Sequence, residues 1–162
     1  MYEDLAQLLH ALDGVEQNPR WHPEGDALYH SLQAFDLARR ESDDRQLWAA
    51  ALLHDVGKGL RCADHDEVGA DLLDGLVAPR VVWLVRHHLD LMRAPAATRR
   101  RVRDKARLSD LERLRRWDVR GRSPTAVVLS VSDALDTLLA DGGETLVEGA
   151  DAPSSSYEEA QH

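Results

Sequence analysis

The sequence of 162 residues predicts an all-α protein. Leucine, alanine and valine supply most of its apolar residues, and aromatic residues make up only 5%. Apolar side chains recur at spacings of three and four, which is typical of amphipathic helices. We find no alternating strand pair, no internal repeat and no glycine-rich phosphate loop. The length suggests one domain that is large enough to bury a core.

The helices can be placed in order along the chain. Residues 5–12 carry the stripe of a first helix, and a loop with two prolines follows. Asp26 is expected to cap a second helix. A third is expected over residues 44–54, because Gly57 and Gly59 come directly after it.

The second half continues the pattern. We expect a fourth helix over residues 68–76 and a fifth that begins at Pro79. Ser109 and Glu112 form a capping-box pattern for a helix through Trp117. Ser123 and Pro124 are expected to start the last helix, with Val127 and later apolar residues facing inward.

The acidic residues are unevenly distributed. The net charge is -9, and residues 141–162 contain six acids and no lysine or arginine. This segment consists mostly of Gly, Ser, Ala and acids, so it offers little apolar surface to bury. We therefore expect a domain over residues 1–140 and a flexible acidic tail over residues 141–162.

The opposite charge gathers in residues 99–122, which hold eleven Lys or Arg and four acids, a net +7. Such a stretch suits a phosphate polyanion such as RNA, although a solvated helix face explains the charge equally well.

Other features bound the class of protein. No apolar run approaches the roughly 20 residues that cross a bilayer, and the acidic N-terminus lacks the basic start of a signal peptide. We therefore expect a cytoplasmic protein without a membrane partner. The single cysteine, Cys62, excludes an intrachain disulfide.

Histidines are concentrated in one part of the chain. Six of the eight lie between residues 22 and 88, and four of these, His30, His54, His65 and His87, lie in or beside different expected helices. In a bundle, such side chains converge on the interior, where metal sites are assembled. Imidazoles with a few carboxylates suit Mn, Fe, Co, Ni or Zn better than Mg or Ca. A carboxylate such as Asp55 can bridge two cations, and an imidazole ring nitrogen cannot.

Several segments resemble a known family. "WHPEGDALYHSL", "AALLHDVGKG", "HDEVGADLL", "VRHHLDL" and "WDVRGR" are similar, in order, to the C-terminal HD domain of bacterial CCA-adding tRNA nucleotidyltransferases. The resemblance covers roughly residues 20–140 and implies an HD-domain helical bundle with a buried metal site. Members of this family are metal-dependent phosphohydrolases, and this HD domain is associated with hydrolysis of 2',3'-cyclic phosphodiesters and 2'-phosphates. The nucleotidyltransferase half is absent, so CCA addition is not implied.

The resemblance also implies a ligand set for two divalent transition metal ions (Mn, Ni, Co, Fe or Zn). The expected ligands are His30, His54, Asp55, His65, Asp118 and one member of the His87-His88 pair. His87 is the preferred member of that pair, with His88 as the alternative. Asp133 is the alternative to Asp118.

Three cations are candidates for contact with a phosphoester. Lys58 follows Asp55 by three residues and could hold a phosphate oxygen as a point charge. Arg120 and Arg122 could bind one in a bidentate manner, or could form surface salt bridges instead. His22 and Glu24 are candidates for the mouth of the pocket.

These observations favour a metal-dependent phosphodiesterase or phosphomonoesterase, with a nucleotide or an RNA end as its substrate. Two alternatives remain: a 5'-nucleotidase of the wider HD group, and an HD-type di-iron oxygenase, in which the same six ligands serve an oxidation. A third is a regulatory module whose site is damaged, although the complete ligand set speaks against it.

Overall fold

A computed structural model describes residues 1–149, and these residues confirm the all-α fold class. They contain no strand, and only one isolated bridge between Glu16 and Asp26 interrupts the helices and loops. The elements are α1 (Tyr2–His10), α2 (Ala27–Glu41), α3 (Arg45–Leu53), the 3₁₀ helix η1 (Val56–Leu60), α4 (His65–Leu73), α5 (Pro79–His87), α6 (Asp90–Arg93), α7 (Pro95–Arg101), α8 (Lys105–Arg120), α9 (Val131–Leu138) and α10 (Glu144–Val147).

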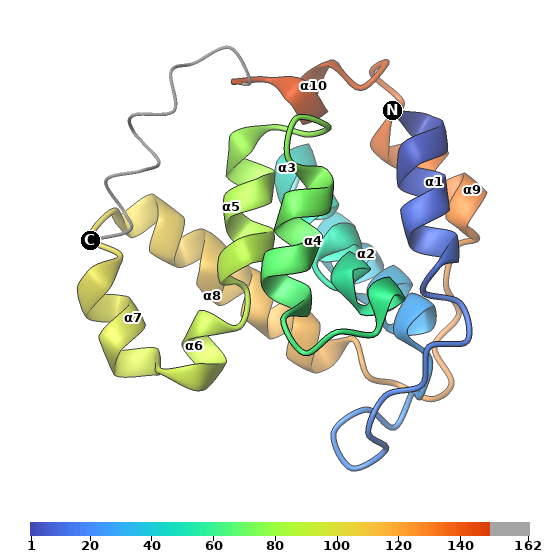
Figure 1. The fold of residues 1–162 in the computed structure, drawn as a ribbon. Coiled ribbons are helices and arrows are strands. Elements are labelled where there is room, and N and C mark those ends of the chain that lie inside the picture. Colours follow the sequence, from blue (N-terminus) through green and yellow to red (C-terminus); the bar gives the residue numbers. More distant parts are fainter. Residues whose placement is uncertain (150–162) are drawn as a thin grey trace.

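The helix α3 lies at the centre of the fold (Figure 1). Its residues Gln46, Leu47 and 49–53 are buried, and it packs against α2, α5 and α8. A helix that is apolar nearly all round must be enclosed by others. Because α3 runs directly into His54 and Asp55, the core places these two residues inside the protein.

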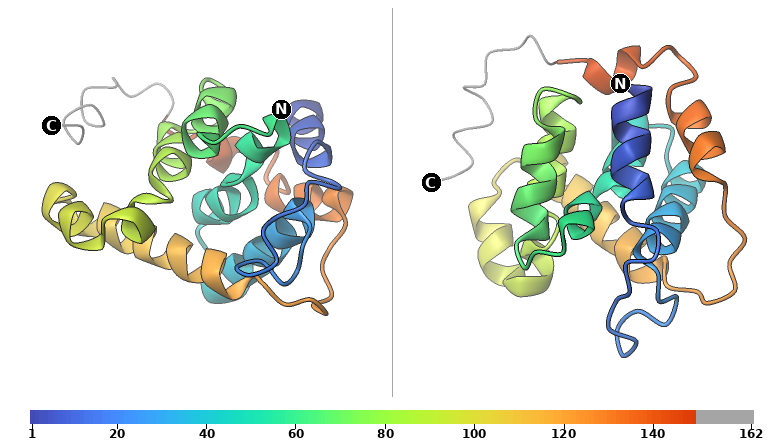
Figure 2. Two further views of the ribbon diagram at one scale, coloured as in Figure 1. Left: turned by 60° about the horizontal axis from the view of Figure 1, so that its bottom comes forward. Right: turned by 45° about the vertical axis from the view of Figure 1, so that its right-hand side comes forward.

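The other helices surround this core (Figure 2). The pair α4 and α5 covers one side, and α1 packs against α9 on another. The pair α6 and α7 projects beside one end of α8, far from α1 and α9. Among the helices of the described residues, none is long and apolar enough to cross a membrane.

The ends of the helices show which local signals were correct. Asp26 caps α2, since its carboxylate accepts a hydrogen bond from the Tyr29 backbone amide at 2.9 Å. Asp44 caps α3 in the same way. The expected capping box at Ser109 was wrong: α8 begins four residues earlier, where the carboxylate of Asp104 accepts from the amides of Ala106 and Arg107.

The expected start of the last helix at Ser123 was also wrong. The helix α9 begins at Val131 and is capped by Ser130, and Val127 is 91% exposed. The segment before it is held against α2 by side chains. The Gln33 amide exchanges two hydrogen bonds with the Ser123 backbone, and the Tyr29 hydroxyl donates to the Ala126 carbonyl. These contacts replace the intrahelical bonds that a helix would form there.

The structure differs from the expected tail in its first nine residues. The helix α10 lies within residues 141–149, and its Leu146 is only 1% exposed. The Gln46 side chain donates to the carbonyls of Thr145 and Glu148, and the Leu146 carbonyl accepts from the Ala78 amide. This piece therefore docks on α3 and on the start of α5. Residues 150–162 lie outside the described residues, and the boundary at residue 140 stays a prediction.

Candidate metal centre

Five segments of the chain bring imidazoles and carboxylates together in the interior. His30 comes from the first turns of α2, and His54 and Asp55 follow α3. The remaining members are His65 at the start of α4, His88 at the end of α5 and Asp118 in the last turn of α8. All of them except His65 are at most 5% exposed.

The first group surrounds one oxygen of Asp55. The Nε2 atoms of His30 and His54 lie 3.3 Å apart. Asp118 Oδ1 lies 3.0 Å from His30 Nε2 and 3.6 Å from His54 Nε2. Asp55 Oδ2 lies 3.3 Å from His54 Nε2 and 3.7 Å from His30 Nε2. Four potential ligand atoms therefore converge on one point.

The second group surrounds the other oxygen of Asp55. His65 Nε2 lies 3.3 Å and His88 Nε2 3.4 Å from Asp55 Oδ1. Both ring nitrogens are buried and have no hydrogen-bond partner. Buried polar atoms normally have partners, so this pair is what a ligand set without its ion would leave. Asp55 stands between the two groups, with one oxygen toward each.

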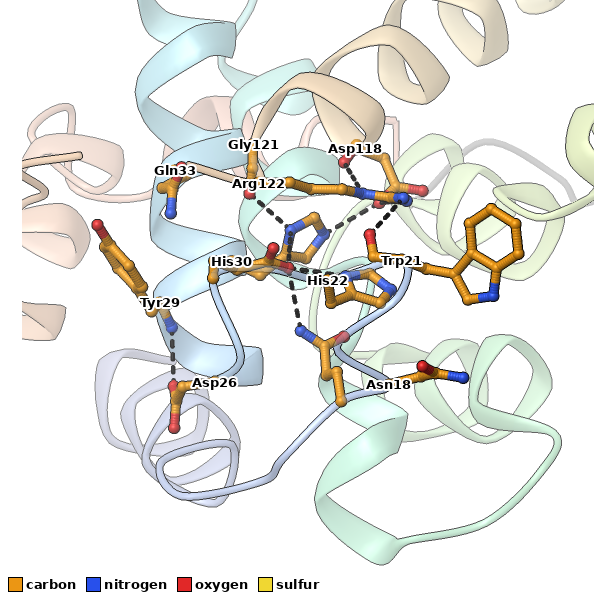
Figure 3. A network of polar contacts seen from close by, with 12 residues as sticks. Asn18, Trp21, His22, Asp26, Tyr29, His30, Gln33, Asp118, Gly121 and Arg122 are labelled. Carbon is orange, nitrogen blue, oxygen red and sulfur yellow. Dashed lines mark hydrogen bonds and ion pairs between the residues drawn. The ribbon is translucent and has the colours of Figure 1, made fainter. Parts of the chain in front are cut away.

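The opposite ring nitrogens fix three of the imidazoles. The Nδ1 atoms of His30, His54 and His88 donate to the carbonyls of Gly121, Ala51 and Val85, at 2.8, 2.7 and 2.6 Å. A backbone acceptor at Nδ1 sets the tautomer, so that Nε2 keeps its lone pair for a cation. Figure 3 shows His30 between the Gly121 carbonyl and Asp118. The donor set and its orientation fit divalent transition metal ions.

The charges of the cluster are strongly coupled. Burial alone would raise the pKa of Asp55, but the charges of His54 and Lys58 lower it well below its ordinary value. Burial alone would lower the pKa of His54, yet the charge of Asp55 and hydrogen bonds with both carboxylates raise it to about 10. Without a metal ion the cluster therefore holds protonated imidazole against carboxylate. A cation that binds there must displace that proton.

The structure separates the two members of the histidine doublet. His88 joins the cluster, whereas His87, the preferred member in the sequence analysis, does not. The Nδ1 atom of His87 lies 2.8 Å from Asp90 Oδ2, and its ring packs against Trp83 with centroids 4.8 Å apart. Successive helical residues are rotated by about 100°, so only one of two neighbours at the end of α5 can face the interior.

The structure also separates the other candidate ligands and cations into those that lie at the cluster and those that do not. Asp118 lies in the first group, and its alternative Asp133 is exposed on the first turn of α9. Lys58 Nζ donates to Asp55 Oδ2 at 2.9 Å. Arg122 Nε donates to the Asp118 carbonyl at 3.1 Å, but Arg120 points elsewhere and pairs with Glu41 at 3.1 Å.

Of the two loop residues expected at the mouth of the pocket, His22 lines a cavity beside the cluster, and Glu24 lies deeper, next to His22 and His30. Glu24 is 8% exposed, and its Oε1 lies 2.7 Å from His22 Nδ1 and 3.3 Å from His30 Nδ1. Its Oε2 is buried without a partner. The sequence analysis did not single out Gln17, whose side-chain oxygen accepts from Lys58 Nζ at 2.5 Å. Nothing in the local sequence marks that contact.

One glycine in η1 and one in α4 explain how α4 reaches the cluster. A Cβ atom on Gly57 would lie 2.0 Å from the His65 carbonyl oxygen, and one on Gly69 would lie 3.2 Å from the Gly57 backbone nitrogen. Only a residue without a side chain allows this approach. The approach brings His65 to Asp55.

The family model named HD domain matches residues 27–138, so the chain belongs to the HD-domain family. Together with the buried His and Asp groups, this membership defines a metal-dependent phosphohydrolase of the HD class.

Among the curated relatives are two proteins named "Multifunctional CCA protein". The one from Hahella chejuensis is 40% identical over 81 residues, which cover 46% of this chain and 19% of that protein. The one from Halorhodospira halophila is 39% identical over 109 residues, which cover 56% of this chain and 26% of that protein. A "Bifunctional uridylyltransferase/uridylyl-removing enzyme" from Gluconobacter oxydans is 45% identical over 75 residues, 41% of this chain and 8% of that enzyme. The chain thus spans about a quarter or less of each of these relatives.

Proposed function

We propose that the protein hydrolyses phosphoesters of nucleotides or RNA ends, and that it prefers 2',3'-cyclic phosphates and 2'-phosphates. The observation that carries the hydrolytic part is Asp55, a buried carboxylate with one oxygen toward each of two imidazole groups. A structural carboxylate would need only one such group. The resemblance to the HD domain of CCA-adding enzymes suggests the preferred ester.

Two divalent transition metal ions would share Asp55. His30, His54 and Asp118 would hold one, and His65 and His88 would hold the other. Ions at such a site lower the pKa of bound water and neutralise charge on phosphate oxygens.

Two cationic residues, Lys58 and Arg122, take part in the proposal. Lys58 is partly exposed and connects Asp55 to Gln17. Its ammonium group can donate to a phosphate oxygen while it keeps Asp55 in place. Arg122 Nη2 lies 3.6 Å from Asp118 Oδ1, so a guanidinium group stands beside the same carboxylate. Arg120 has no part in this proposal because it pairs with Glu41.

A nucleotide substrate has two further supports. The names of the relatives refer to CCA and to the removal of uridylyl, both of which are nucleotide groups. The basic segment over residues 99–122 includes the end of α7 and all of α8, and its last residues lie beside Asp118. Exposed guanidinium groups there, such as those of Arg100 and Arg103, could contact the phosphates of an RNA strand.

A metal-loaded phosphoester panel tests the proposal. Elemental analysis should find two metal ions per chain after loading with Mn or Ni. The panel contains 2',3'-cyclic nucleotides, 2'-, 3'- and 5'-nucleotides, and a small chromogenic ester. We expect the cyclic and 2' esters to be hydrolysed fastest.

An RNA with a 2',3'-cyclic end extends the panel. Its hydrolysis should fall steeply between low and moderate salt, whereas the small ester should respond much less. Faster hydrolysis of 5'-deoxynucleotides without this salt contrast would instead identify a 5'-nucleotidase. Oxygen consumption by iron-loaded protein that cleaves no phosphoester would contradict the proposed function altogether.

A further inference from the structure

A cavity opens directly beside the candidate metal centre. It measures about 700 Å³, which is within the usual range for small-molecule sites. One wall is the loop before α2, with Gln17, Asn18, Trp21 and His22, and the other is η1 and its end, with Lys58 and Arg61. Lys58 Nζ bonds both Gln17 in this wall and Asp55 in the cluster, so a single side chain connects the cavity wall to that carboxylate.

The cavity wall contains an aromatic ring that the core does not use. Trp21 is 57% exposed, whereas Trp83 and Trp117 are at most 6% exposed. The Arg20 guanidinium lies over its ring, 4.8 Å from the centroid. An exposed indole in a concave, cation-lined site is the arrangement that stacks nucleobases in proteins that bind single-stranded nucleic acid.

The backbone of Trp21 is tied to the ligand set. Arg122 Nη1 donates to the Trp21 carbonyl at 2.9 Å, and the same side chain donates through Nε to the Asp118 carbonyl. In Figure 3 the indole points away from the imidazoles, on the far side of the Arg122 guanidinium. The indole and Lys58, which bonds Asp55, line the same cavity, so one ligand in that cavity could contact both side chains.

The loop that carries Trp21 is closed by its own hydrogen bonds. The Asn18 carbonyl accepts from the amides of Trp21 and His22, and the Gly25 carbonyl accepts from the Gln17 amide. Gly25 has φ +80°, a conformation that favours glycine. His22 follows Trp21 directly, and its ring meets that of His30 with centroids 5.3 Å apart. The backbone that carries the indole is therefore held in place by the loop itself.

We propose that Trp21 is a specificity residue, on which the base of the scissile nucleotide stacks while its phosphate lies at the metal centre. The inference rests on the proposed function, because it names the part of the substrate that this site recognises. Stacking tolerates any base, so the site would select a nucleoside over a base-free ester and would discriminate little among the four bases.

The experiment compares two substrates that differ only in the base. They are adenosine 2',3'-cyclic phosphate and 1-O-methylribose 2',3'-cyclic phosphate, assayed with metal-loaded wild type, Trp21→Ala, Trp21→Phe and the control Val127→Ala. Val127 is also exposed but lies in the segment before α9. Trp21→Ala should lower kcat/KM for the adenosine ester about tenfold, mainly through KM. The base-free ester should be unaffected, and Trp21→Phe should restore part of the loss.

A binding measurement separates this inference from the proposed function. Calorimetry with adenosine 2'-monophosphate and with 1-O-methylribose 2-phosphate reports base recognition without turnover. Normal hydrolysis of both esters by Trp21→Ala would overturn the stacking inference and leave the proposed function intact. Base-dependent binding that Trp21→Ala abolishes, in a protein that cleaves no phosphoester, would support the inference and contradict the hydrolase. A uniform loss on both esters would also overturn it, because it would show a structural role.

Discussion

Two charged clusters in this molecule are built in opposite ways. Each side-chain nitrogen of Arg80 has a hydrogen-bond partner within the chain. Its Nη2 lies 2.9 Å from Asp44 Oδ2 and 2.8 Å from Asp110 Oδ2, and its Nη1 donates to Asp44 and to Gln46. Around Asp55, the ring nitrogens of His65 and His88 have no hydrogen-bond partner.

The difference distinguishes a structural ion network from a site. In the Arg80 network, burial raises the pKa of Asp44, but hydrogen bonds and the charge of Arg80 lower it below its ordinary value. That shift stabilises the fold above the unfolded pKa of Asp44, and the contribution is lost as pH falls through the folded pKa. Both clusters shift pKa values, so a shift alone does not identify function. The site is distinguished by two ring nitrogens that have no hydrogen-bond partner and that face the same carboxylate oxygen.

The largest expected effect is a loss of activity when the cluster around Asp55 is changed. Asp55→Ala should lower hydrolysis more than about a hundredfold, since even residues that only orient metal ligands contribute about 10–100-fold. The helical content by circular dichroism should stay nearly unchanged. Initial rates on a 2',3'-cyclic nucleotide give the measurement. Substantial residual activity would mean that the site is elsewhere.

The next effect concerns the segment that reaches the Arg80 network through Gln46. A chain that ends at Ala140 loses the buried Leu146 and two hydrogen bonds of Gln46. We expect a loss of about 3 kcal/mol in the free energy of unfolding. In a thermal melt this lowers Tm by about 6–12 °C. A chain that ends at Gly149 is the control and should melt like the wild type.

Arg80→Ala should break the first cluster and spare the second. It leaves Asp44 and Asp110 without their cation, which should cost about 2 kcal/mol, between the values for exposed and buried ion pairs. Urea unfolding measures the loss. Activity per folded molecule should equal that of wild type, and reduced activity would show that the two clusters are coupled.

The smallest expected effect is the change in metal affinity per pH unit. His54, with its pKa raised to about 10, is protonated at neutral pH and must lose that proton to bind a cation. Affinity for Mn or Ni should rise about tenfold per pH unit between pH 6 and 8. The metal-free protein should change in the other direction and lose stability as pH rises from 6.5 toward 10. Calorimetry in buffers of different protonation enthalpy checks the proton release, and pH-independent binding would contradict it.

Helical periodicity alone would have chosen His88 over His87 as the ligand. Val81, Leu84 and Val85 are buried, and the same helical spacing continues to His88 and leaves His87 outside. The buried position of His54 and Asp55 could be predicted for the same reason, because a buried helix such as α3 carries its last residues inward. The stripe that locates a core helix therefore also locates its ligands.

Other features depend on contacts between distant segments, which local patterns do not contain. Ser123 and Pro124 form a good helix start, but Gln33 and Tyr29 hold that segment in another conformation. Leu146 is almost alone among small and acidic residues, and no local pattern shows that Gln46 and Ala78 bind its neighbourhood. Gln17 meets Lys58 across a loop closure, and its own sequence gives no sign of this contact.

Gly57 sets how accurately the two halves of the ligand set fit together. His30, His54 and Asp118 come from one piece of the fold, formed by α2, α3 and α8, and His65 and His88 come from a second, formed by α4 and α5. Backbone lies against backbone where the two pieces meet, so no rotamer can adjust to fill or relieve that joint. One added methyl group, with no charge and no contact with any carboxylate, would move the pieces apart. The distance between the two groups of ligands thus depends on a residue without a side chain at position 57. A substitution there would disrupt the metal centre although it changes none of the ligands.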